Sequence, residues 1–490
     1  MNPPPASKRV NRLASNLTLD RFGERVEWCV NFLEPDEKVV EPPDGVPLAN
    51  AIRNLAELWV HLAPLSKISS RTWERAIGKE SSVPYALIRA IVTIYHDLTP
   101  EVLTLPTFEE FEAATVEIKK ARERWVLATQ SITENRAALA ELGKCYHAAV
   151  DELPSFPLIG KSDWILEKPQ ELTEFDPLPE RDMFTIDPVA PPLDGLNIGY
   201  QAIATRALAR KRLRWNGDSY RLLKIERTDS RLNFTFGPTT YYAYVDSLEA
   251  MGAELADFAL KNSGAIPKAL HRRGPPDHVF DFRRRSAFAG VNCILFLKNY
   301  YRGNSSKSRV SSPHQFVLHD RRGDALEARN TFHVVPAGGH QPAKEFGNNS
   351  EWSIWRTAVR EFCEELFDKP EARKLLKAGG DFIEHPKIKP IIDKFFRKPA
   401  AKIFLLGVGL DPLTTKPEIL AAIVVDWQKI EMHAELRIET NYEGEATYHD
   451  LSHDELLLQA TMARRKPMLP AGKAALLLAA KNFDFLVNSI

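Results

Sequence analysis

A concentration of proline in the middle of the chain limits how the protein can fold. Residues 151–195 contain eight prolines. Proline lacks a backbone N–H and has a fixed φ, so it interrupts helices and is excluded from central strands. We therefore predict that residues 151–195 form a linker between the N-terminal and the C-terminal regions of the chain. The chain has 490 residues, enough for about two to four domains.

The charge and the apolar pattern exclude several classes of protein. Lys plus Arg number 65 and Asp plus Glu number 65, so no net charge attracts nucleic acid or an anionic membrane to the whole molecule. The apolar runs are too short for a signal peptide or a bilayer span, which predicts a cytoplasmic protein without membrane contact. The four cysteines are widely spaced, a pattern typical of neither a disulfide framework nor a CxxC zinc site.

The first 105 residues have a helical pattern. A helix is expected to start near Ser69, between two other short helices, and the triplet resembles bacterial helix-turn-helix regulators. Arg71 and Arg75 on the middle helix are the candidate DNA-binding residues. A small helical bundle with a mixed-charge surface is the alternative, because any three short helices can produce this pattern.

Two further regions lie on either side of the linker. Residues 106–150 lack proline beyond Pro106 and are predicted to form one or two long helices, which could serve as a homodimerisation arm. Residues 196–284 are predicted to be a small α+β region. It has a basic helix near 206–214, a strand pair at 220–225 and 232–236, and a helix at 247–260.

Residues 285–490 have the pattern of an α/β domain. Short runs rich in Val, Ile, Leu and Phe predict a mixed or antiparallel sheet with strands at 289–297, 315–319, 331–335, 403–410 and 419–427. A helix is predicted at 352–367, where four apolar residues form one stripe: Trp355, Val359, Phe362 and Leu366. A final helix is expected at 471–487.

The other face of the helix at 352–367 is acidic. Glu361, Glu364 and Glu365 are spaced at i, i+3 and i+4, so their carboxylates lie together and repel one another. A hard cation relieves that repulsion. Mg²⁺ or Mn²⁺ is expected, because such ions take oxygen ligands and can bridge phosphate oxygens. Arg360 can orient a carboxylate or a phosphate through its fork of donors.

These residues resemble the Nudix hydrolase superfamily. Arg360 to Glu365 has the form of the core of the Nudix box, and residues 334–339, Val-Val-Pro-Ala-Gly-Gly, resemble the strand and glycine turn that lead into it. The resemblance implies an α/β/α sandwich over residues 285–490. It also implies metal binding by Glu364 and Glu365, metal binding or base action by Glu361, and a carbonyl ligand from Gly338 or Gly339.

The sequence departs from the family pattern in three places. Gly339 and Arg360 are 21 positions apart, which is longer than in the family and implies an insertion inside the box. Phe367 stands where the family has the glycine that ends the helix, so the helix is expected to run on or to be capped differently. Residues 369–398 are expected to form a second, helical insertion before the next strand.

Other candidate site residues lie outside the box. The family often uses a late glutamate, for which Glu443 and Glu445 are candidates. Arg285 and Arg321 are candidate contacts for the substrate pyrophosphate. His449 and His453 are four positions apart, but Ser452 followed by Glu455 indicates a helix start rather than a metal pair.

The leading hypothesis from the sequence is a Mg²⁺-dependent hydrolase. Its substrate would be a nucleoside diphosphate linked to another group, cleaved at the pyrophosphate. The N-terminal helices would couple this activity to regulation. The alternative is a non-catalytic Nudix-like nucleotide sensor in a DNA-binding transcriptional regulator.

Overall fold

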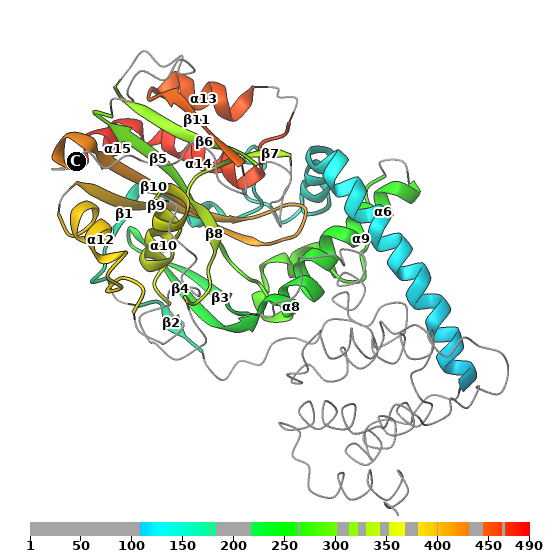
Figure 1. Ribbon diagram of the computed structural model, residues 1–490. Helices are drawn as coiled ribbons and strands as arrows, with labels where there is room; N and C mark the ends of the chain where they lie inside the picture. The colour runs from blue at the N-terminus through cyan, green and yellow to red at the C-terminus, as the bar shows by residue number, and fades with distance from the viewer. Residues whose placement is uncertain are drawn as a thin grey trace, which may run out of the picture. The chain divides into compact units, whose positions relative to one another are not determined.

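The structure is a computed structural model, shown in Figure 1. It describes residues 108–176, 178–182, 217–262, 265–300, 313–321, 330–343, 352–367, 381–398, 400–430, 444–462 and 466–490. The chain divides into two units, residues 1–126 with 191–214 and residues 127–190 with 215–490. The expected helix-turn-helix, with Arg71 and Arg75, and the expected basic helix near 206–214 lie outside the described residues.

An eight-stranded mixed sheet organises the second unit. Six strands lie in the order β1 (Ile165–Leu172), β9 (Ala401–Leu410), β10 (Pro417–Asp426), β5 (Gly290–Lys298), β6 (Gln315–Arg321) and β11 (Gly444–Asp450). β7 (Thr331–Val334) pairs with β6, and β8 (Ala337–Gly339) pairs with β5. Only β10 and β5 are parallel among these described pairs. The five strands predicted after residue 285 are confirmed.

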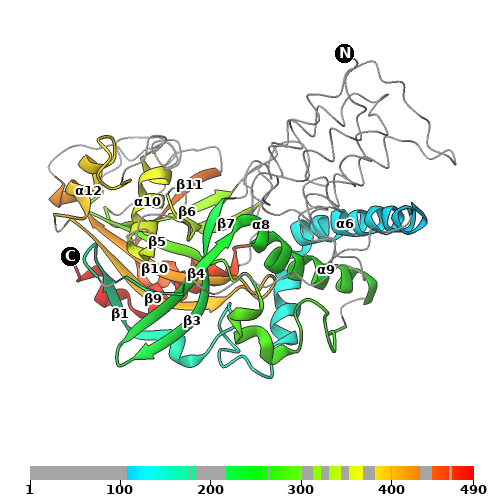
Figure 2. The same ribbon diagram turned by 90° about the horizontal axis from the view of Figure 1, so that it is seen from below.

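Helices cover both faces of this sheet. Side chains alternate along β5, so that Val291, Cys293 and Leu295 join one core while Ile294 and Phe296 join the other. The first core is closed by α10 (Ile354–Leu366) and α12 (Lys389–Phe395), which Figure 2 shows on one side of the sheet. The second is closed by α13 (His453–Thr461), α14 (Pro470–Lys481) and α15 (Phe483–Val487). This part of the protein is therefore a three-layer α/β structure.

The region predicted as a separate α+β middle segment is continuous with this fold. β3 (Asp218–Thr228) and β4 (Arg231–Thr240) form a hairpin, joined by β2 (Glu180–Arg181), and confirm the predicted strand pair. The predicted helix is present as α8 (Tyr241–Tyr244), a π-helical stretch (Val245–Glu249) and α9 (Ala250–Asn262). However, Tyr220 and Phe236 of the hairpin lie in the same core as α10. The predicted boundary at 284/285 therefore does not separate two cores.

The predicted linker is folded over part of its length. Its residues 165–172 form β1, and Leu158 and Ile159 just before it are fully buried. β1 is an edge strand and its register is interrupted between Ile165 and Gln170, where Pro169 stands. Proline is tolerated at such a position, since no ladder hydrogen bond is needed there. The prediction of a linker over 151–195 is wrong for this part.

The remaining elements are helical. α6 (Phe108–Tyr146) confirms the predicted long helix, and its non-helical backbone at Asn135 divides it into two pieces. Short 3₁₀ turns lie at Ser162–Trp164, Pro276–Phe280, Phe282–Arg284 and Trp427–Lys429. Among the described helices, none is long and apolar enough to cross a membrane.

Candidate functional site

The helix α10 carries the candidate site and forms as its sequence predicts. Ser353 caps its N-terminus by accepting a hydrogen bond from the Arg356 backbone N–H at 3.3 Å. The predicted apolar stripe is buried against the sheet. The helix ends at Leu366, and Phe367 leaves the helical conformation with its ring against Phe362 and Phe395. Packing of an aromatic side chain therefore accompanies the helix end, at the position where the Nudix pattern has glycine.

Two of the three candidate carboxylates lie against strand β8. The Glu365 carboxylate accepts a hydrogen bond from the Ala337 backbone N–H at 3.2 Å. The Glu361 carboxylate covers Gly338 so closely that a Cβ at that position would lie 2.2 Å from the carboxyl carbon. Only glycine leaves room for this carboxylate, which gives the glycine turn a physical reason. Glu364 is half-buried on the same helix.

Arg360 joins the helix to the same turn. Its guanidinium is buried and donates to the carbonyl oxygens of Gly339, at 3.0 Å, and Gln341, and to the Glu361 carboxylate at 2.7 Å. Three acceptors satisfy a charge that would otherwise be costly to bury. The predicted carbonyl ligand Gly339 therefore already accepts one hydrogen bond, from Arg360.

The carboxylates change the pKa of Cys293, a residue on the strand beneath them. Burial raises the pKa of the Cys293 thiol well above its ordinary value, and the negative charges of Glu365 and Glu361 raise it further. Cys293 faces α10 from β5. Cys293 is therefore a buried, uncharged side chain on the strand beneath the carboxylates.

The present side-chain arrangement is not a closed metal cage. Among the residues that the structure describes, no three His, Cys, Asp or Glu side chains are grouped so that they could hold a metal ion. Glu361 is turned toward Arg360 and Glu365 toward Ala337. Their oxygen donors match the ligands that Mg²⁺ and Mn²⁺ take, so the donor types fit such an ion.

The other predicted site residues lie elsewhere. Glu445 is on the edge strand β11, opposite Asp320 of β6, whereas α10 packs on β8 and β5. Arg321 ends β6 and is paired in register with Gly444 and Thr331. Neither position is on the strands that carry the glycine turn. Glu443 lies outside the described residues.

Arg285 differs from its predicted role in substrate binding. Its side chain is buried and donates to the carbonyl oxygens of His278, Val279 and Asp281. Its guanidinium lies 5.2 Å from the centre of the Phe282 ring. Arg285 therefore stabilises a tight turn before β5 and is not open to a substrate. The sequence could not show this, because a run of three arginines gives no sign of which one is buried.

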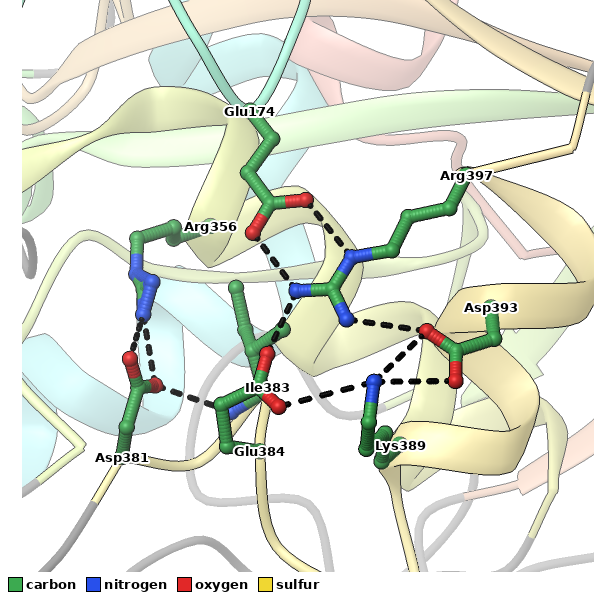
Figure 3. A network of polar contacts seen from close by, with 8 residues as sticks. All are labelled: Glu174, Arg356, Asp381, Ile383, Glu384, Lys389, Asp393 and Arg397. Atoms are coloured by element: carbon green, nitrogen blue, oxygen red, sulfur yellow. Dashed lines mark hydrogen bonds and ion pairs between the residues drawn. The ribbon is translucent and has the colours of Figure 1, made fainter.

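The second insertion is tied to α10 by ion pairs, which Figure 3 shows. Arg356 of α10 contacts the Asp381 carboxylate at 2.5 Å. Arg397 contacts Glu174, Glu384 and Asp393 at 2.5 to 2.8 Å. These contacts attach residues 381–398 to α10 and to the loop that follows β1. The predicted insertion is helical over α12.

The sequence predictions missed two buried residues of the site, His340 and Thr357. His340 follows β8 directly, and its Nδ1 lies 2.8 Å from the Thr357 hydroxyl on α10. Both are almost completely buried. Their positions next to the glycine turn and one helical turn before Glu361 are the only sequence signal that could have indicated them.

His449 and His453 confirm the prediction of a helix start. Ser452 caps α13 by accepting from the Glu455 backbone N–H at 3.1 Å. His449 lies on β11 beside Phe316, and its Nδ1 is 3.4 Å from the Glu455 carboxylate. His449 therefore lies near the end of a strand and His453 at the start of a capped helix, as the sequence predicts.

No protein-family model matches this chain, and no curated protein matches it.

Proposed function

We propose that the protein is a Mg²⁺- or Mn²⁺-dependent hydrolase that cleaves a pyrophosphate linkage in a nucleotide-type small molecule, in the manner of the Nudix superfamily. One observation carries the proposal: the carboxylates of Glu361 and Glu365 both lie against strand β8, at Gly338 and Ala337, and Arg360 links the helix to that turn. A helix of carboxylates held over a backbone turn is an arrangement suited to a cation that also takes phosphate oxygens.

The residues have separate roles in this proposal. Glu361, Glu364 and Glu365 would hold the metal, with a carbonyl of the Gly338–Gly339 turn. The bound ion would supply charge neutralisation on the phosphate oxygens and a more acidic water. Glu361 would accept the proton of the attacking water, and Arg360 would hold the Glu361 carboxylate at 2.7 Å.

Substitution of the two adjacent glutamates tests the proposal. The wild-type protein and the Glu364→Gln/Glu365→Gln variant are incubated with Mg²⁺ and a panel of nucleoside diphosphate conjugates, and products are followed by ³¹P NMR. We expect wild type to convert at least one substrate into two phosphate monoesters, and the variant to be slower by about 10²-fold or more. Glu384→Gln, in the ion-pair network of Figure 3, is the matched control. If wild type releases no product from any substrate, the proposal is wrong.

A second function is supported by the orientation of the same carboxylates. Because Glu361 and Glu365 are engaged by Arg360 and the Ala337 N–H, the site could bind a nucleotide without turning it over. The protein would then be a nucleotide sensor that regulates DNA binding by its N-terminal region. In this case nucleotides raise the melting temperature of the full chain without Mg²⁺ and without product formation. Full-length Arg71→Ala would also bind DNA less tightly than wild type.

A further inference from the structure

His340 is fixed in place by its backbone. It follows the glycine turn, and its N–H donates to the Ala289 carbonyl at 2.8 Å. Its own carbonyl accepts from the Tyr220 N–H at 3.0 Å. The residue is thereby joined both to the start of β5 and to β3, so the segment after Gly339 cannot shift without breaking two backbone hydrogen bonds.

The side chain of His340 connects this segment to the carboxylate helix. Its Nδ1 is 2.8 Å from the Thr357 hydroxyl, and Thr357 is only 2% exposed. Thr357 precedes Glu361 by four positions, one turn of α10, so the two side chains lie on the same side of the helix. One hydrogen bond therefore links the glycine turn to the helical face that bears the carboxylates.

Aromatic rings prevent the imidazole from turning away. The His340 ring lies 4.8 Å from the Tyr220 ring and 4.6 Å from the Phe236 ring, measured between centroids. Trp352 stacks on Tyr220 at 4.1 Å, immediately before the residue that caps α10. The β3–β4 hairpin thus supplies two walls of the cage. Burial, and then the positive charge of Arg360, lower the pKa of His340 to about 3, so the ring is neutral near pH 7.

We propose that His340 and Thr357 are positioning residues, which hold the α10 carboxylates in register with the Gly338–Gly339 turn and thereby set the affinity of the site for a divalent cation. This inference rests on the proposed function. It adds that the β3–β4 hairpin, through Tyr220 and Phe236, is part of the machinery of the site. Removal of a hydrogen bond made directly to a metal ligand commonly changes metal affinity by about 10- to 100-fold. The His340–Thr357 bond acts one step further from the ligands, so its removal is expected to change the affinity by up to about tenfold.

Removal of the Thr357 hydroxyl tests this inference. Mn²⁺ binding to the full chain is measured by the loss of the EPR signal of the free ion. Thr357→Val keeps the shape of the side chain and removes the hydrogen bond, and we expect it to weaken Mn²⁺ binding several-fold, up to about tenfold. Thr357→Ser keeps the hydroxyl and loses only the methyl group, and this variant is expected to bind Mn²⁺ as wild type does. Thr357→Ala is measured in parallel, because it removes the hydroxyl without adding a methyl group.

His147→Asn is the matched control. His147 is also fully buried, and its pKa is also lowered to about 3, but its Nδ1 contacts the Pro276 carbonyl at 3.1 Å. We expect this variant to lose stability and to keep its Mn²⁺ affinity. Wild-type affinity in both Thr357→Val and Thr357→Ala would overturn the positioning role and leave the proposed function standing. Equal weakening in His147→Asn would also overturn it, and no Mn²⁺ binding by wild type would overturn both.

Discussion

Replacement of Gly338 by alanine should displace the Glu361 carboxylate, and thereby lower both the free energy of unfolding and the affinity of the site for Mn²⁺. A Cβ at this position would lie 2.2, 2.3 and 2.5 Å from the Cδ, Oε1 and Oε2 atoms of Glu361. Ordinary contacts between such atoms begin near 3.4 Å, so the carboxylate must move by about 1 Å or more. Since it is the end of a flexible side chain, it can move without displacing the backbone.

Movement of the Glu361 carboxylate lowers the stability of the fold. The carboxylate is 2.7 Å from the Arg360 guanidinium, and a shift of about 1 Å takes this pair beyond hydrogen-bonding distance. Loss of a hydrogen bond to a charged group lowers the free energy of unfolding by about 1.5–3 kcal/mol. The Mn²⁺ affinity of Gly338→Ala should fall by about tenfold or more, because a proposed ligand is displaced.

Urea unfolding and Mn²⁺ titration of the same preparations check both quantities. Gly409→Ala is the control. Gly409 is on β9, and a Cβ there would lie 2.7 Å from the Cβ of Leu158, which belongs to the core on the other face of the sheet. It should lose about 1–3 kcal/mol by overpacking and bind Mn²⁺ as wild type does. If Gly338→Ala binds Mn²⁺ as tightly as wild type, the contact between Glu361 and the turn does not matter for the site, and the reasoning is refuted.

Two further predictions concern stability. The pKa of His147 is about 3 in the folded protein against an ordinary value of 6.5, so the unfolded chain takes up a proton between pH 6.5 and 3. The contribution of His147 to the free energy of unfolding is therefore fully present above pH 6.5. It falls as the pH is lowered, by up to about 1.4 kcal/mol per pH unit. His147→Gln should reduce the pH slope of urea unfolding by about one proton, and an unchanged slope would show that another group titrates. Arg397→Ala breaks the ion pairs of Figure 3, whose acidic partners are 18–50% exposed. We expect a loss of about 1 kcal/mol or less, smaller still in 1 M NaCl; a larger loss that salt does not change would contradict this.

Local patterns predicted the elements of the fold well. The strands around the site and α10 could be predicted because apolar residues alternate or recur with helical spacing, and each pattern depends only on near neighbours. The cap of α13 at Ser452 could be predicted for the same reason. Secondary structure that is determined within a turn or a strand is therefore visible in the sequence.

Contacts between distant segments could not be predicted. Pro169 made residues 165–172 look like a linker, because the sequence does not show that β9 leaves an edge for another strand. Tyr220 is 120 positions before His340, and only the folded chain shows that their rings meet. Likewise Arg285 and Arg360 are both buried arginines, yet only Arg360 is next to a carboxylate of the candidate site.

The carboxylates of α10 show why the candidate site was predictable and its state was not. Three glutamates at helical spacing repel one another whether or not a metal is present. The structure relieves part of this repulsion with the Arg360 guanidinium at Glu361 and the Ala337 N–H at Glu365. A cation must compete with these partners, so its affinity depends on the difference between metal–carboxylate contacts and the hydrogen bonds given up. Because that difference is set by the position of α10 over strand β8, the residues that fix this position control the site as much as its ligands do.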